Sequence, residues 1–315
     1  MPIAPKSLNL IAETDYSGTD FSYVDGLIGP GQFTYLTGHP GSGKSFALYE
    51  LGLCLISGRP FLGRAVNRQA NCLLVDGEMG EARCGRRLQR MMRGESSYFK
   101  SDFYLDTQGR FRLDDEVERK AIIAWMIEND TDVLLIDSLT RIVGSHLLEN
   151  ESKHMALVGQ YFTEIKDRTD CSIMVIHHSS KGSSALRGSS ELLAQADNVF
   201  LVEERSNVRV ISPVKTRDLS TEEGFRAAFT ITAEKNDGIA LTTVLIPQKS
   251  EAYGNDLRER INDTIRSEQG ISSRDLREKV KCANATLLAI LKELSAENEI
   301  ELRIEGHKKL YYRGS

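Results

Sequence analysis

Cysteine is scarce in this sequence, and its spacing suits neither a disulfide framework nor a zinc site. The chain has 315 residues and five cysteines, and none of them form a C-x-x-C motif. We therefore expect free and mostly buried thiols, as in a protein of a reducing compartment. The cysteines are Cys54, Cys72, Cys84, Cys171 and Cys282.

Long hydrophobic runs are absent as well. No apolar stretch approaches the roughly 20 residues that a membrane-spanning helix needs. The first residues, MPIAPKSLNLIAETDYSG, do not show the basic and then apolar pattern of a secretory signal. We expect a cytoplasmic protein with no membrane partner.

An excess of positive charge is the third feature that the sequence lacks. Lys and Arg number 40 against 45 Asp and Glu, which gives a formal net charge of −5. This balance argues against nucleic-acid binding through bulk positive charge, although it is compatible with a local basic patch or channel. The hydrophobic share of 40% is ordinary for a soluble protein, and the length suits one large domain and a small one.

The most informative stretch that is present covers residues 32–45, QFTYLTGHPGSGKS. A β-prone run leads into GHPGSGKS, which fits the P-loop pattern G-x-x-x-x-G-K-[ST] without a mismatch; a glycine-rich turn that matches by chance is the alternative. Glycines let successive N–H groups surround a phosphate, and the helix from Phe46 to about Ile56 would add its positive end. Lys44 would reach the β- and γ-phosphates and Ser45 would bind Mg²⁺, so ATP and Mg²⁺ are the expected cofactors. The predicted nucleotide-binding residues are Gly38, Pro40, Gly41, Ser42, Gly43, Lys44 and Ser45.

Two carboxylates follow apolar runs at positions suited to hydrolysis. Asp137 ends the run DVLLID and suits a Walker B role, in which it would hold Mg²⁺ or a water ligand of the metal. Ser138 comes next, where many AAA+ ATPases have a glutamate. Glu78, after LLVDG, is therefore the candidate general base that would orient and deprotonate water, as in RecA-type ATPases. The alternative is that Glu78 only begins a helix, where acidic residues are favoured.

Polar side chains also follow two later strands. His178 ends VIHH, where it could hydrogen-bond the γ-phosphate or the attacking water; an ordinary polar strand end is the alternative. A metal site is not expected, because adjacent His177 and His178 point to opposite faces of a strand. Lys215 and Arg217 are two residues apart, so on a strand they would point the same way. They could extend into a neighbouring subunit's phosphate site as an arginine finger does, or be a solvated basic pair.

Strands and helices alternate up to about residue 198, and successive strands follow. This order predicts an α/β fold with a parallel, right-handed sheet that continues as antiparallel strands at one edge. The expected strands cover 72–76, 103–105, 132–137, 172–178, 198–203, 207–214, 225–233 and 239–246, and the expected helices 80–93, 114–128 and 151–168.

The composition changes after residue 248. Residues 249–255 resemble a linker, and three short helices are expected at 256–268, 273–280 and 285–297. A hairpin around Glu305–His307 would follow, which completes the pattern of a winged helix. We therefore predict two domains, an ATPase domain with a short N-terminal arm over 1–248 and a linker with a winged-helix domain over 249–315.

The ordered set GHPGSGKS, LLVDGE, DVLLIDS, VIHHSSKG…RGSS and VKTRD resembles the RecA-like core of the RepA and DnaB hexameric helicases, particularly the RepA-type branch. The resemblance covers about residues 20–247. It implies a homo-oligomer, a hexameric ring with active sites between subunits. Lys44, Ser45, Glu78 and Asp137 would act in cis, with His178 as γ-phosphate sensor. Lys215 and Arg217 would act in trans. The chain departs from this family in its C-terminal extra domain and short N-terminal arm.

The resemblance also implies single-stranded or forked DNA as partner, bound by loops that follow two strands. These loops cover about 142–152 and 179–187, and the second offers Lys181 and Arg187. The winged helix would contact DNA or a replication protein. The sequence thus favours an Mg²⁺-dependent ATPase acting as a RepA-like replicative helicase of a mobile element. The alternative is an ATP-switched loader or recombinase-like ATPase that binds DNA or a partner without unwinding.

Overall fold

The computed structural model divides the chain into two compact units, Met1–Leu245 and Ile246–Ser315. Both the division and the predicted boundary after residue 248 fall in or beside 245–250, which lie outside the described residues. The structure describes residues 7–8, 22–92, 99, 101–109, 111–147, 151–178, 194–205, 207–217, 224–233, 238–244, 252–280, 287, 290–291, 294–295, 299–305 and 308–314. Each unit is described by itself.

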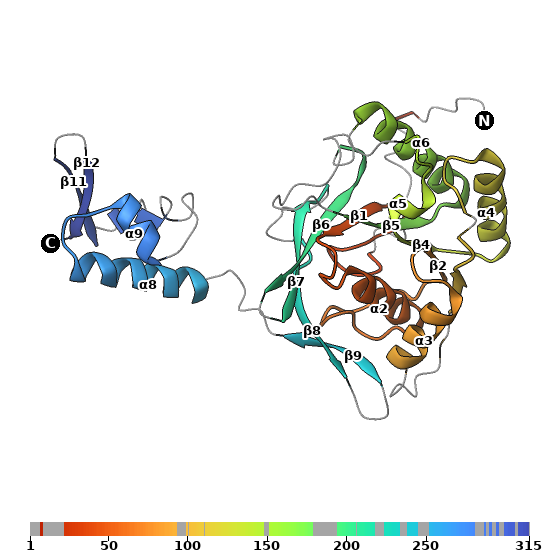
Figure 1. The fold of residues 1–315 in the computed structure, drawn as a ribbon, viewed down its shortest axis with the longest axis horizontal. Helices are drawn as coiled ribbons and strands as arrows, with labels where there is room; N and C mark the ends of the chain where they lie inside the picture. Colours follow the sequence, from red (N-terminus) through yellow and green to blue (C-terminus); the bar gives the residue numbers. More distant parts are fainter. Residues whose placement is uncertain are drawn as a thin grey trace. The chain divides into compact units, whose positions relative to one another are not determined.

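A nine-stranded sheet runs through the first unit, in the order β3-β2-β4-β5-β1-β6-β7-β8-β9 (Figure 1). The strands from β3 to β6 pair in parallel, and β6 to β9 pair antiparallel. The strands are β1 (Phe33–Gly38), β2 (Cys72–Asp76), β3 (Phe103–Asp106), β4 (Val133–Asp137), β5 (Ser172–His178), β6 (Asn198–Arg205), β7 (Val208–Lys215), β8 (Ala227–Ala233) and β9 (Ile239–Val244). This arrangement confirms the predicted fold class of a parallel sheet with antiparallel edge strands.

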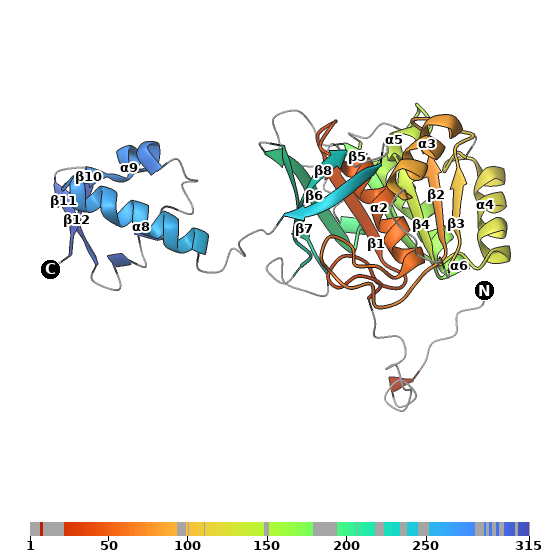
Figure 2. The same cartoon turned by 90° about the horizontal axis from the view of Figure 1, so that it is seen from below.

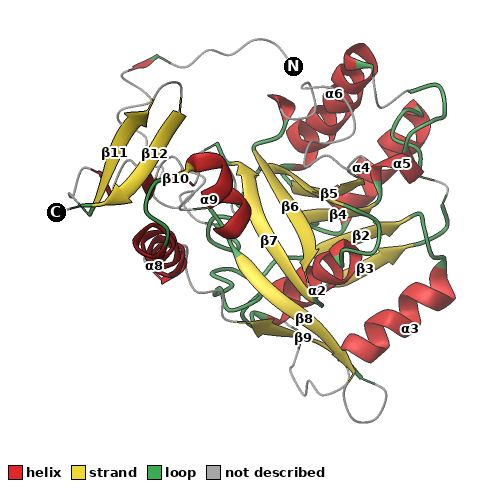
Figure 3. Cartoon of the chain, turned by 60° about the vertical axis from the view of Figure 1, so that its left-hand side comes forward, coloured by secondary structure: helices red, strands yellow, loops and turns green. Residues whose placement is uncertain are grey.

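Helices cover both faces of the parallel part of the sheet (Figures 1 and 3). On one face, α2 (Lys44–Ser57) and α3 (Glu81–Met92) pack in a core that includes Leu48 and Leu88. On the other, α4 (Glu116–Glu128), α5 (Leu139–Ile142) and α6 (Ser152–Thr169) share a core that includes Ile123. Burial on both faces explains why β1, β2 and β4 read as continuous buried runs without alternation.

The strand directions give the sheet two chemically different sides, one at the carboxyl ends and one at the amino ends of its parallel strands. The strands β1, β2, β4 and β5 all end at one edge, called here the carboxyl edge, because they are parallel. The strand β7 runs the other way, and its last residue Lys215 pairs with Val199 near the start of β6. Lys215 therefore lies toward the opposite edge, called here the amino edge.

The main differences between the predicted and the observed elements involve only a few residues each. The helix α2 begins at Lys44, two residues before the predicted start, because the P-loop glycine Gly43 already serves as its N-cap. The four-residue α5 was not predicted, since so short a helix shows no periodicity. No helix among the described residues is long and apolar enough to cross a membrane.

The second unit has its own small core and a three-stranded sheet in the order β10-β12-β11 (Figure 2). Its elements are α8 (Ala252–Ser267), β10 (Ile271–Ser272), α9 (Ser273–Val280), β11 (Ile300–Glu305) and β12 (Lys308–Arg313). The predicted third helix over 285–297 lies largely outside the described residues, although Leu287, Leu291 and Leu294 are buried in the core. The winged-helix assignment stays a prediction.

Candidate active site

The P-loop joins β1 to α2 at the carboxyl edge, and neighbouring chain segments pack closely against it. A Cβ atom at Gly38 would lie 2.3 Å from the carbonyl oxygen of Val202 on β6. At Gly43, φ is +92°, and a Cβ atom would lie 2.7 Å from Cδ of Arg209 on β7. A left-handed φ and these close approaches require glycine at both positions, independently of any phosphate.

The side chain of Lys44 is buried against the P-loop. Its Nζ donates hydrogen bonds to the carbonyl oxygens of Gly38 at 2.9 Å and His39 at 2.8 Å. Burial lowers the pKa of Lys44 to about 8, against the opposing effects of Asp137 and Glu78. The ammonium group is thus held away from water, where an entering phosphate would be a stronger acceptor than two carbonyls.

Asp137 ends β4 beside the P-loop and is only 2% exposed. Burial raises the pKa of its carboxyl to about 6, the nearby charges of Asp76 and Glu78 raise it further, and a hydrogen bond from Ser45 lowers it. A bound cation would offset the cost of burying this negative charge. One hydroxyl and one carboxylate oxygen suit Mg²⁺, which prefers hard oxygen ligands. The side chains present therefore fit Mg²⁺.

Glu78 follows β2 and meets the ends of β4 and β5. Its Oε1 accepts a hydrogen bond from Ser138 Oγ at 2.9 Å and lies 3.4 Å from His178 Nε2. The contact with His178 is the main reason why the pKa of Glu78 falls to about 2; the hydrogen bond from Ser138 acts in the same direction. Glu78 is ionised at neutral pH, so it can orient a water molecule. A carboxylate with so low a pKa is a weak base, and proton abstraction would need its pKa to rise.

Asp76 holds Glu78 in this position, and the sequence analysis did not identify it. Its Oδ1 accepts the backbone N–H groups of Glu78 at 2.8 Å and Met79 at 2.9 Å, and Tyr49 donates its hydroxyl to Oδ2 at 2.5 Å. The fully buried carboxylate thus fixes the turn that follows β2. An aspartate two residues before the candidate base is the signal of such an Asx turn.

Arg87 of α3 is a second residue that the sequence analysis missed. Its guanidinium carbon lies 4.4 Å from the ring centre of Phe46, directly after Ser45, and 5.3 Å from that of Tyr49. Its charge also lowers the pKa of Asp137. Helical spacing alone could not reveal this contact, because α3 reaches the P-loop only through the packing of the sheet.

Lys215 and Arg217 lie outside this group of residues. Lys215 Nζ donates to the carbonyl oxygen of Ala196 at 2.7 Å, and Arg217 pairs with Asp197 at 2.9 Å. Asp197 also accepts the backbone N–H of Phe33 at 2.7 Å, at the start of β1, whereas the P-loop begins at the end of this six-residue strand. Five residue steps of a strand span about 17 Å. The two cations therefore do not contact the P-loop of their own subunit.

The prediction that Lys215 and Arg217 point the same way because both lie on a strand is wrong for Arg217. Arg217 lies beyond the last residue of β7, so the alternation of a strand does not set its direction. Both side chains nevertheless reach one segment, Lys215 at Ala196 and Arg217 at Asp197. Tertiary contacts therefore bring them together, where the prediction relied on strand geometry.

The two predicted DNA loops are described only in part. Residues 142–147 and 151–152 of the first loop are described, and 148–150 are not. The second loop, 179–187 with Lys181 and Arg187, lies outside the described residues. Their predicted contact with DNA stays a prediction.

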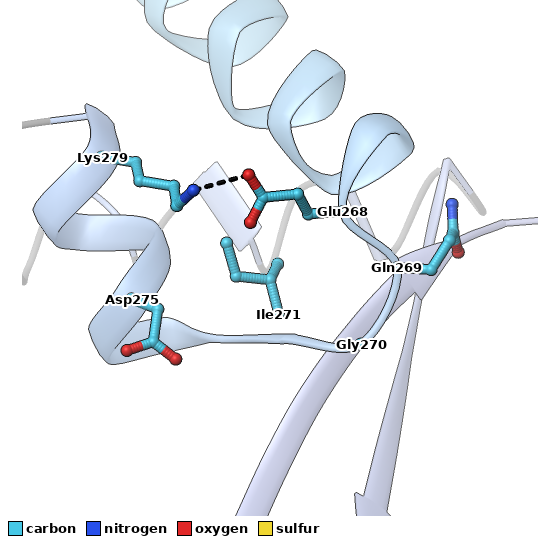
Figure 4. Close-up of a pocket in the computed structure, with 6 residues that line it drawn as sticks. All are labelled: Glu268, Gln269, Gly270, Ile271, Asp275 and Lys279. Atoms are coloured by element: carbon cyan, nitrogen blue, oxygen red, sulfur yellow. Dashed lines mark hydrogen bonds and ion pairs between the residues drawn. The ribbon is translucent and has the colours of Figure 1, made fainter.

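A separate pocket lies in the second unit, between the end of α8 and α9 (Figure 4). Lys279 Nζ pairs across it with Glu268 Oε1 at 2.5 Å. The pocket is lined by Glu268, Gln269, Gly270, Ile271, Asp275 and Lys279. None of these lining residues is a predicted nucleotide-binding residue.

Comparison with known proteins gives one matching family and several similar solved structures, two of which are described here. The family described as AAA domain matches residues 21–184, which include the P-loop, Glu78, Asp137 and His178. Two solved structures are similar over about two thirds of this chain. The ATPase domain of G40P has 14% identity and a TM-score of 0.48, over 68% of this chain and 85% of the other. The RadB recombinase has 22% identity and a TM-score of 0.45, over 67% and 90%. A search of curated proteins found no match.

The fold and the P-loop define a P-loop ATPase with an α/β core. Because the matched segment covers more than half of the chain, the chain belongs to the AAA domain family. Nucleotide binding follows from this family and from the geometry of the loop. The roles of single residues are proposals.

Proposed function

We propose that this protein is a Mg²⁺-dependent ATPase that works on DNA as an oligomer, a RepA-like replicative helicase in the form of a hexameric ring. Lys44 binds the β- and γ-phosphates, while Ser45 and Asp137 hold Mg²⁺. Glu78 orients the attacking water, and His178 senses the γ-phosphate through its contact with Glu78. This assignment rests on the way in which four strands bring these groups to one edge of the sheet.

The position of Arg217 carries the oligomeric part of the proposal. Its side chain is 57% exposed at the amino edge, away from the P-loop of its own subunit. Phosphoryl transfer commonly needs a cation that neutralises charge developing on the transferred group. A head-to-tail ring would bring the amino edge of one subunit to the carboxyl edge of the next. Arg217 and Lys215 would then complete the neighbour's site.

The catalytic step follows from the positions of these side chains. Ser45 and Asp137 would hold Mg²⁺, and the bound ion would supply positive charge that neutralises the phosphate oxygens. Glu78 holds water for in-line attack on the γ-phosphate. As the water becomes nucleophilic, its proton passes to Glu78, whose pKa must rise from about 2. Withdrawal of His178 toward the γ-phosphate would raise that pKa, because the His178 contact is its largest depressing influence.

Strand displacement on forked DNA is the decisive experiment. DNA with a 5′ or a 3′ single-stranded tail is incubated with ATP and Mg²⁺, and displacement and hydrolysis are followed in the same sample. We expect displacement that prefers one tail and is lost in Lys44→Ala. Hydrolysis without displacement on either fork would reject the helicase and leave the ATPase in place.

One observation supports a second candidate function, an ATP-switched loader or recombinase-like ATPase. Three cations of the second unit are paired with acids, as in Arg258–Glu299, Lys279–Glu268 and Arg303–Glu301. Paired cations have less charge to offer a phosphate backbone, which favours docking of a replication protein at this unit. ATP-dependent complex formation without unwinding would support this candidate.

A further inference from the structure

Arg209 packs against the P-loop from outside the candidate catalytic group. It is the second residue of β7, and its side chain is 13% exposed. A Cβ atom at Gly43 would lie 2.7 Å from Arg209 Cδ and 3.1 Å from Arg209 Nε. The side chain therefore lies directly against the backbone that leads into α2.

The hydrogen bonds of Arg209 leave part of its guanidinium without a partner. Nη2 pairs with Glu204 Oε1 at 2.9 Å, and Nη1 donates to the carbonyl oxygen of Asn207 at 3.2 Å. Nε is buried and has no hydrogen-bond partner among the residues that the structure describes. A buried donor without an acceptor costs stability, so a ligand that supplied an acceptor here would be favoured.

The order of the strands tells which end of ATP comes near Arg209. The strand β1 carries the P-loop, with β5 on one side and β6 on the other. Glu78, Asp137 and His178 follow β2, β4 and β5, all on the β5 side, so the γ-phosphate and Mg²⁺ belong there. The nucleoside, at the other end of the phosphate chain, would then extend toward β6 and β7. Arg209 and Glu204 lie on that side.

The pairing of Arg209 with Glu204 indicates that this position suits a nucleoside better than a phosphate group. A carboxylate beside the guanidinium would repel a phosphate group. Ribose hydroxyls and base edges instead carry donors and acceptors together, and they match an N–H group beside a carboxylate oxygen. Glu204 is 40% exposed, so its oxygens are accessible to a ligand.

We propose that Arg209 and Glu204 bind the nucleoside of ATP, its ribose hydroxyls and base. This inference rests on the proposed ATPase function and assigns these two residues to substrate recognition. A contact with the nucleoside is the same in the bound and the transition state. Its loss therefore raises KM and leaves kcat unchanged. A residue that only supported the shape of the P-loop would change kcat as well.

Paired binding measurements on the full-length protein test this proposal. Calorimetry with Mg²⁺ compares ATP with inorganic tripolyphosphate, which has three phosphates and no nucleoside. We expect Arg209→Gln and Glu204→Gln to weaken ATP binding about 10-fold, the loss typical of one hydrogen bond to a charged group, with tripolyphosphate binding unchanged within twofold. Arg168→Gln removes a half-exposed arginine paired with Glu164 on α6 and serves as the matched control.

Three outcomes would overturn the proposal. Equal weakening of ATP and tripolyphosphate would show that Arg209 supports the P-loop, and unchanged ATP binding in both variants would show that neither residue contacts the ligand. Should Arg209→Gln unfold, Arg209→Lys and Glu204→Gln decide the question by the same comparison. A wild-type protein that binds tripolyphosphate but not ATP would reject the nucleoside site, and one that binds neither would reject the ATPase function itself.

Discussion

The two edges of the nine-stranded sheet are made by the same strands, but they hold their charges in opposite ways. At the carboxyl edge, burial lowers the pKa of Lys44 and raises that of Asp137, so both charges are disfavoured. At the amino edge, Asp197 accepts a backbone N–H and pairs with Arg217. The charges of Lys44 and Asp137 are thus incomplete without a charged ligand, whereas Arg217 and Asp197 satisfy each other in a single chain. A binding site needs charges that become favourable only when the ligand binds. An arginine finger needs a side chain that its own subunit already holds in place.

The largest expected effect tests whether the amino edge acts on another subunit. Arg217→Ala should lower kcat about 10³-fold, because an arginine finger stabilises the charge of the transferred phosphoryl group. ATP hydrolysis is measured for this variant, for Lys44→Ala and for their mixtures. Recovery of activity in the mixtures supports action in trans, since shared interfaces can combine an intact P-loop with an intact Arg217. No recovery at any ratio would contradict it.

Glu78→Gln should lower kcat about 10²-fold and leave ATP binding nearly unchanged. The amide keeps the shape of the side chain but has no charge to hold and deprotonate water. Steady-state hydrolysis and calorimetry with ATP measure the two quantities separately. A variant that loses ATP binding to the same extent as hydrolysis would show that Glu78 holds the nucleotide or the metal.

The ion pairs of the amino edge should matter for stability. Asp197→Ala removes the acceptor of the Phe33 N–H and the partner of Arg217, and should lower the free energy of unfolding by about 3 kcal/mol. Urea unfolding measures this change. Glu116→Gln, which breaks the exposed pair with Lys120, is the control and should leave the free energy of unfolding nearly unchanged. Equal effects would show that the Asp197 carboxylate contributes no more to stability than a fully exposed ion pair does.

Asp137→Asn, at the carboxyl edge, should raise the free energy of unfolding, whereas Asp197→Ala lowers it. The pKa of Asp137 in the folded protein, about 6, is above the ordinary aspartate value of 3.8, so folding favours the protonated form. That stability is fully present below about pH 4 and is lost as the pH rises through 6. Without Mg²⁺ and nucleotide, the asparagine variant should therefore be more stable than wild type by about 3 kcal/mol at pH 8 and nearly equal to it at pH 4. Thermal unfolding in EDTA at both pH values checks this, and an equal gain at both would exclude titration as the cause.

The smallest effect concerns the support of Glu78. Tyr49→Phe removes the hydroxyl that donates to Asp76, and should cost about 1 kcal/mol of stability and a few-fold in kcat. Hydrolysis and unfolding are compared with those of Glu78→Gln. An unchanged kcat would show that the two backbone N–H groups alone hold the Asp76 carboxylate in place.

Much of the carboxyl edge could be predicted because its signals are local. The P-loop pattern is continuous, and Glu78, Asp137 and His178 each follow an apolar strand. Parallel strands bring such positions together, and the structure does so: Glu78 contacts Ser138 and His178. Asp76 and Arg87 were missed because each acts through residues distant in sequence. The amino edge was predicted from spacing alone, and the stated reason was wrong for Arg217.

The sequence by itself determined the nucleotide loop, the alternation of strands and helices, and the acids at the strand ends, since each depends on neighbouring residues. Only the tertiary structure decided which edge each charge occupies and what it contacts. Phe33 meets Asp197 across 164 residues, and Gly43 meets Arg209 across the sheet. Such contacts depend on strand order, and strand order is set by the packing of both faces of the sheet. The contacts of Asp197 and Arg209 therefore could not be predicted from the spacing of residues along the chain.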